Sequence, residues 1–95
     1  MNLVKFDDPI SNINIRNVVN TWFSSPAPVE NTYGDISNWN VSNVENMSYM
    51  FAYQSGFNHD LSSWDVSKVV DCKGFRVESD SYVLPIPNFT LCDPN

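Results

Sequence analysis

Few residues in this chain of 95 are able to do chemistry. The single histidine, His59, precedes Asp60, but a Ser-His-Asp triad also needs a nucleophile, and the sequence identifies none. Most other carboxylates lie in segments expected to be turns, where they cap backbone amides. The sequence has neither a phosphate-binding loop nor a calcium loop. We therefore expect no enzyme activity, no cofactor and no metal, and a small hydrolase is the least favoured function.

Two cysteines, Cys72 and Cys92, form the other reactive pair. Their spacing fits neither a C-x-x-C redox motif nor a zinc site. A disulfide between them would close a loop of about 21 residues and contribute roughly 3 kcal/mol in the chain-entropy model. A chain this short needs such a contribution, because it buries only about 60–65% of its unfolded surface. We expect the disulfide, and with it an oxidising compartment; two buried free thiols are the alternative.

Composition and charge describe one small, acidic, folded domain. Hydrophobic residues make up 42% of the chain, and the formal net charge is −6. This charge disfavours nucleic acid and anionic membranes as partners. No apolar run approaches the roughly 20 residues that span a bilayer, and the first residues lack the pattern of a signal peptide. We expect a monomer that neither binds nucleic acid nor inserts into a membrane.

An internal repeat determines the elements that must position these side chains. Residues 35–44 recur as residues 60–69, with six of ten positions identical. The separation of the two copies along the chain lies within the range of about 20–50 residues that is typical of the repeat period in solenoids. Trp39 and Val41 alternate with polar residues, as their equivalents do one unit later. This alternation predicts short parallel strands, with Trp64 on Trp39 and valine on valine.

A helix is expected before the repeat. Its apolar residues follow a helical spacing: Ile15, Val18, Val19, Trp22 and Phe23. Asn14 is its expected N-cap, and Pro26 is expected to end it. Residues 24–32 lack periodicity and predict a turn-rich connector. The helix would cover the exposed apolar face of the first unit.

A second, shorter helix is expected within the first unit. It would begin at Asn46, its N-cap, because Met47, Met50 and Phe51 fall on one helical face. A return turn follows, in which Gly56 is free to take positive φ and the next residue, a phenylalanine, faces inward.

These patterns predict an α+β fold: a short, leucine-rich-repeat-like solenoid of about two coils with short parallel strands. An N-terminal amphipathic helix and a disulfide-closed C-terminal segment would cap it. One domain spans 1–95, with a helical cap and connector at 10–32, a full repeat at 33–58, a terminal repeat at 59–75 and a C-terminal cap at 76–95. We expect the repeat to stop at residues 72–75, where Cys72 and Gly74 replace Met47 and Tyr49 of the first unit. Pro85, Pro87 and Pro94 follow, and prolines cannot donate to a further strand.

The polar face of the expected strands is the candidate binding surface. Strand alternation directs six polar side chains away from the core: Asn40, Ser42, Asn43, Asp65, Ser67 and Lys68. An ordinary solvated sheet face is the alternative interpretation. Aromatic contacts from Tyr49, Tyr53 and Tyr82 could add to this surface, although packing at the margin of the core explains them equally well.

Residues 33–51 and 57–67 resemble the BspA-like surface-protein repeat, which is also found in mycoplasma lipoproteins. The pattern W-D-V-S-x-V-x-x-M-x-x-M-F carries the resemblance, and the closing C-x-G-F at 72–75 and P-x-P-N-F-T-x-C at 85–92 extend it to about residues 10–93. It implies a non-catalytic, extracellular or cell-surface recognition or adhesion module that binds a protein or glycan on another cell or matrix. A structural cap or spacer of a larger surface protein is the alternative. Members usually carry many repeats, whereas this chain has one full and one terminal unit.

Overall fold

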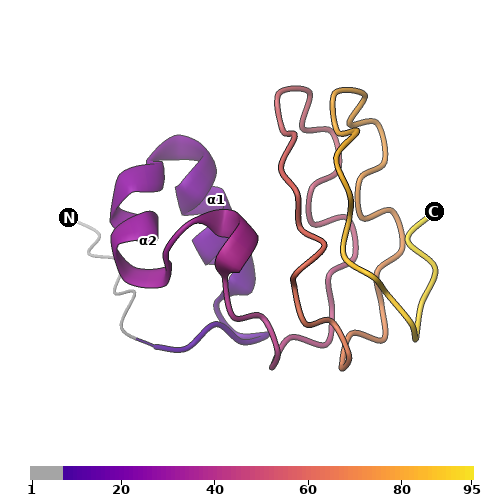
Figure 1. Cartoon of the computed structure of the whole chain (residues 1–95), viewed down its shortest axis with the longest axis horizontal. Coiled ribbons are helices and arrows are strands. Elements are labelled where there is room, and N and C mark those ends of the chain that lie inside the picture. The colour runs from indigo at the N-terminus through magenta and orange to yellow at the C-terminus, as the bar shows by residue number, and fades with distance from the viewer. Residues whose placement is uncertain (1–7) are drawn as a thin grey trace.

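The fold consists of a helical part followed by stacked loops. A computed structural model describes residues 8–95 (Figure 1). Its helical elements are α1 (Ile15–Ser24), α2 (Pro26–Tyr33) and the short 3-10 helix η1 (Ile36–Asn38). After η1 the chain runs back and forth in loops that lie side by side, next to the helices (Figure 1). One hydrophobic core continues from α1 through these loops.

Helix α1 is the predicted amphipathic helix, and its boundaries agree with the expected ones. Its buried side chains are Ile15, Val18 and Val19. Asn14 occupies the N-cap position, but its side chain does not cap the helix. Instead Asn14 Oδ1 accepts the Ser11 N–H at 2.8 Å, and Asn14 Nδ2 donates to Pro9 O at 3.1 Å. The asparagine therefore closes the turn that precedes α1.

Helix α2 occupies the segment predicted to be a turn-rich connector, so that prediction is wrong. Both prolines of α2 lie in its first turn, beginning with Pro26 at the first helical position. The N–H groups of a first turn have no acceptor within the helix, so proline is tolerated there. Val29 is fully buried, and Trp22 Nε1 of α1 donates to Glu30 Oε2 of α2 at 3.1 Å.

The predicted parallel strands are absent from residues 8–95, so the α+β, leucine-rich-repeat-like solenoid with a parallel sheet is wrong. Only an isolated parallel bridge, Asn46 with Asp71, occurs where the units meet. The reason lies in the polar residues that alternate with the apolar ones. Asn40 Oδ1 accepts both the N–H and the hydroxyl of Ser42, at 3.1 and 2.6 Å. Such local bonds bend the backbone and take amides out of a sheet ladder.

The same local turn recurs along the loops. In each copy the side-chain oxygen of an Asp or Asn accepts the N–H and the hydroxyl of the serine two residues later. The copies are Asp35–Ser37, Asn40–Ser42, Asn46–Ser48, Asp60–Ser62 and Asp65–Ser67. The short sequence D/N-x-S therefore determines the path of both repeat units.

The predicted short helix that begins at Asn46 is also absent. Tyr49 and Tyr53 have left-handed backbones, with φ of 55° and 61°, and one unit later Gly74 and Glu78 have φ of 67° and 57°. A left-handed residue cannot continue an α-helix. The amides of this segment instead donate to carbonyls of the next unit at 2.7–2.9 Å, and hydrogen bonds between the units thus replace those of a helix. The pairs are Met47 with Asp71, Tyr49 with Lys73, Phe51 with Phe75 and Tyr53 with Val77.

The aromatic core follows the predicted register even though strands are absent. The rings of Trp39 and Trp64 stack with centroids 6.1 Å apart and planes 16° apart, which confirms tryptophan on tryptophan. Phe57 faces inward, as predicted, and meets the Tyr82 ring of the next unit at 5.0 Å. Gly56 does not have the left-handed backbone expected of it; among the described glycines, Gly34 and Gly74 do.

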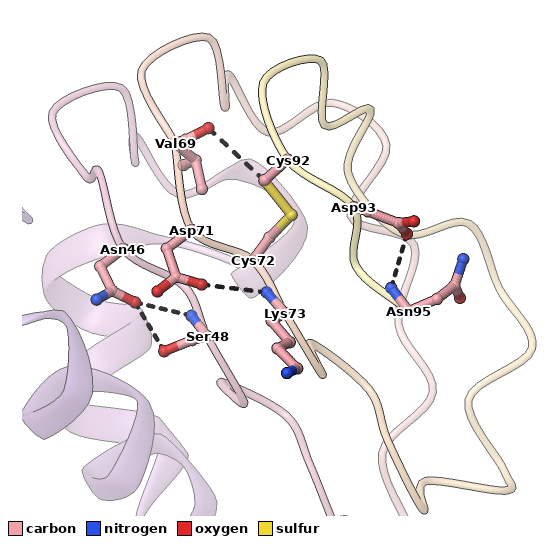
Figure 2. Close-up of a disulfide and its surroundings, with 9 residues drawn as sticks. All are labelled: Asn46, Ser48, Val69, Asp71, Cys72, Lys73, Cys92, Asp93 and Asn95. Carbon is pink, nitrogen blue, oxygen red and sulfur yellow. Dashed lines mark hydrogen bonds between the residues drawn. A yellow bond between two sulfur atoms is a disulfide. The ribbon is translucent and has the colours of Figure 1, made fainter.

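The disulfide between Cys72 and Cys92 is confirmed (Figure 2). It joins the second unit to the proline-rich tail, which lies alongside that unit (Figure 1). Ile86 and Phe89 of the tail pack on the core at the positions that correspond to Leu61 and Trp64 in the preceding unit. The Leu61 N–H also donates to Pro85 O at 2.9 Å, with the same separation along the chain as the pairs between the first two units. The tail therefore continues the register as a partial third unit, and the repeat does not stop where the sequence predicts.

Candidate functional site

The structure brings the six predicted binding residues together on one surface. All are exposed except Ser42, which is half-buried. The units stack so that equivalent positions of the two repeats become neighbours, and Lys68 Nζ donates to Asn43 Oδ1 at 3.4 Å. The residues come from turns, however, and not from the strands that were predicted to present them.

Local bonds within the turns already occupy part of this surface. Asp65 Oδ1 accepts the N–H and the hydroxyl of Ser67 at 3.1 and 2.7 Å, in the same way that Asn40 accepts from Ser42. The Ser67 hydroxyl and then the Ser67 amide lower the pKa of Asp65 below its ordinary value of 3.8, with a smaller effect of Lys68. The carboxylate is therefore ionised at neutral pH, and its second oxygen bonds to no described residue.

The tyrosines proposed as additional contacts differ in accessibility. Tyr53 is 70% exposed and Tyr49 is 49% exposed, whereas Tyr82 is almost fully buried. Burial raises the pKa of the Tyr82 hydroxyl, and the guanidinium of Arg76 opposes part of this effect. Tyr82 is thus a core residue, and only the other two remain as candidates for contact with a partner.

A hollow in the described surface lies away from these residues, between the end of α1 and the turn at 54–59. Its volume is about 380 Å³. Eight residues line it: Trp22, Phe23, Pro26, Gln54, Ser55, Gly56, Phe57 and His59. The Trp22 ring stands nearly perpendicular to the rings of Phe57 and His59, with centroids 5.7 and 5.3 Å away. These residues are far apart in the chain, and their individual patterns predict only a core helix and a return turn.

A family model described as "Mycoplasma protein of unknown function, DUF285" matches residues 2–92. The chain belongs to the DUF285 family. No curated protein and no solved structure gives a significant match. The DUF285 match is compatible with the resemblance to a repeat found in mycoplasma lipoproteins, and it assigns no activity or partner to the family.

In this DUF285 chain, the small-hydrolase hypothesis predicts a pocket that joins His59 to two acidic groups. His59 lines the hollow, but the eight lining residues include no carboxylate. Within residues 8–95, no three His, Cys, Asp or Glu side chains come together as metal ligands. No helix in that range is long and apolar enough to cross a membrane.

Proposed function

We propose that this DUF285 protein is a non-catalytic, extracellular recognition or adhesion module of the BspA-like surface-repeat type. It acts as a monomer and binds a protein or glycan on another cell or matrix. Its contact surface consists of Asn40, Ser42, Asn43, Asp65, Ser67 and Lys68. The observation that carries the proposal is that the polar residues of the first repeat lie beside those of the second, where Lys68 Nζ donates to Asn43 Oδ1.

The physical basis of this surface is its preorganisation. The serine–Asx bonds hold the backbone of each turn, so little order is lost when a partner binds. The surface presents a lysine ammonium, an aspartate oxygen and side-chain amides, which together match a polar partner. The Cys72–Cys92 disulfide supports an oxidising location, because disulfides rarely persist in a reducing cytosol.

The test is binding of the labelled, disulfide-intact chain to matrix-coated wells and to intact cultured cells, before and after glycosidase treatment. We expect saturable binding that the double variant Asn43→Ala, Lys68→Ala weakens by about tenfold or more. Lys73→Ala is the matched control, since it removes another exposed lysine of the same unit. Saturable binding that the double variant leaves unchanged would exclude this surface.

A structural cap or spacer of a larger surface protein is the second candidate. The observation in its favour is that Asn40, Ser42, Asp65 and Ser67 bond to one another within their turns, as residues with a purely structural role would. This alternative predicts no saturable binding to wells or cells. It also predicts that the double variant unfolds at the same urea concentration as the unmodified chain.

A further inference from the structure

We propose that the hollow between α1 and the turn at 54–59 binds a neutral pyranose ring, an inference that rests on the recognition function proposed above. The recognition module would then have a second binding site, specific for a sugar and separate from the polar surface around Asn43 and Lys68. The hollow's volume of about 380 Å³ lies near the lower limit of the range typical of small-molecule sites. This size suits one or two sugar rings.

Aromatic rings supply the apolar wall. Trp22 and Phe23, on the last turns of α1, remain partly exposed although they belong to the edge of the core. Trp22 is fixed in place, because its indole N–H donates to Glu30 Oε2 and its ring forms T-shaped pairs with the rings of Phe23 and Phe57. One face of a pyranose carries mainly C–H groups, and a fixed aromatic surface covers such a face at little entropic cost.

Polar side chains on the opposite segment complete the match. Gln54, Ser55 and His59 line the hollow, and no hydrogen bond among the described residues uses their side chains. An amide, a hydroxyl and an imidazole can each donate and accept. Sugar hydroxyls have the same double capacity, so a pyranose can satisfy all three groups at once.

The charges indicate a neutral ligand. The lining contains no Lys, Arg, Asp or Glu, so a charged sugar would lose its hydration without gaining an ionic partner. The net charge of −6 also repels anionic sugars before they arrive. The hollow therefore favours unsubstituted or N-acetylated hexoses over uronic or sialic acids.

Gly56 offers a way to block the hollow without disturbing the fold. Its backbone lies outside the left-handed region, and a Cβ added there would meet no atom within 4 Å. Gly56→Leu should fold normally and fill the space above the aromatic wall. Ser81 is the exposed equivalent one unit later, so Ser81→Leu adds the same side chain away from the hollow.

The experiment is ¹H–¹⁵N NMR titration of the full, disulfide-intact chain with four methyl glycosides, those of glucose, galactose, mannose and N-acetylglucosamine. We expect at least one to cause saturable, millimolar-range shifts of the Trp22 indole and the Gly56 amide, while the buried Trp39 and Trp64 indoles stay unchanged. Gly56→Leu should weaken this binding about tenfold or more, and Ser81→Leu should not. Well-dispersed spectra of both variants would verify that they fold.

Several outcomes would overturn the inference. Absence of saturable shifts with all four glycosides, or equal binding by Gly56→Leu, excludes the hollow as a sugar site. If glucuronate binds as tightly as the neutral glycosides, the argument from charge is contradicted. If a proline-rich peptide shifts these signals and no glycoside does, the hollow is a peptide groove instead. Cell or matrix binding that persists while the glycosides fail removes this inference alone. Glycoside binding without any cell or matrix binding removes the adhesion proposal instead.

Discussion

Residues 35–58 of the first repeat and the corresponding residues 60–83 form the same turns with different side chains. Asn40 and Asp65 each hold a serine two residues later, and Tyr49 has the same left-handed backbone as Gly74. A Cβ at Gly74 would overlap the Tyr49 ring, so the second unit lacks a side chain where the first extends one. The repeat thus preserves backbone conformation, while some equivalent positions, such as Tyr49 and Gly74, differ so that neighbouring units fit together.

The largest expected effect concerns the stacked tryptophans. Trp64 Nε1 donates to the Ile36 carbonyl of the preceding unit at 2.7 Å in a buried position, whereas Trp39 Nε1 donates within its own unit to Gly34 O. Trp64→Ala should lower the free energy of unfolding by about 3–5 kcal/mol. Trp64→Phe should cost more than Trp39→Phe, because water cannot replace the buried bond. Urea unfolding measures both, and equal costs of the two Phe variants would contradict the asymmetry.

The next effect concerns the crosslink, which only the second unit has. Met47 occupies in the first unit the position that Cys72 occupies in the second. Replacing both cysteines by alanine should lower the free energy of unfolding by about 3 kcal/mol, through the freedom gained by the unfolded chain. Amide exchange should rise most in residues 83–92 and least in α1. A uniform rise across the chain would show that the tail does not open separately from the rest.

A smaller effect is expected at the complementary pair Tyr49 and Gly74. Gly74→Ala should cost about 1–2 kcal/mol from its left-handed backbone, with a further cost of displacing the Tyr49 ring. In a Tyr49→Ala background only the backbone cost should remain. A double-mutant cycle by urea unfolding separates the two costs. Additive effects would mean that the ring moves aside freely.

The smallest effect is the response to acid. The hydroxyls of Ser37, Ser62 and Ser67, and then their amides, lower the pKa values of Asp35, Asp60 and Asp65 below 3.8. A carboxyl group whose pKa is lower in the folded state than in the unfolded state stabilises the fold at pH values above its unfolded-state pKa. This stability is lost as the pH falls through the folded-state pKa. The urea concentration at the midpoint of unfolding should therefore decrease as the pH falls below about 3.8.

Asparagine provides the control for this pH dependence. The double variant Asp60→Asn, Asp65→Asn should keep the turns, because Asn40 forms the same one naturally. Its urea midpoint should vary less with pH than that of the unmodified chain. An unchanged pH profile in the double variant would assign the acid response to other carboxylates.

Much of the arrangement could be predicted because it depends on spacing along the chain. Helical periodicity located α1, the period of the repeat placed Trp64 on Trp39, and the cysteines paired as expected. The backbone conformation was mispredicted because alternating apolar and polar residues occur both in strands and in successive tight turns. The D/N-x-S sequence distinguishes the two cases, because the serine binds the preceding Asx side chain.

The other incorrect or missing expectations have separate causes. Prolines usually indicate a connector, yet at the start of α2 they occupy positions where no N–H is needed. The period of the repeat places the candidate residues Asn43 and Lys68 next to each other, as the structure has them, although the predicted strands that were to present them are wrong. The aromatic hollow joins α1 to the turn at 54–59, and no local pattern relates segments so far apart.

The regular separation of the backbone hydrogen bonds between units has a genetic consequence. Five of these bonds, among them Met47 with Asp71 and Leu61 with Pro85, join partners 24 residues apart, and the amides of Val70 and Asp71 reach Glu45 O across 25 and 26 residues. Inserting or deleting a few codons between such partners would shift every later contact out of register. Duplicating the codons of one whole unit would preserve the spacing and lengthen the protein without redesigning either end. Alleles of such genes should therefore differ in length by whole units, a change that unequal recombination between similar repeats can produce in one step.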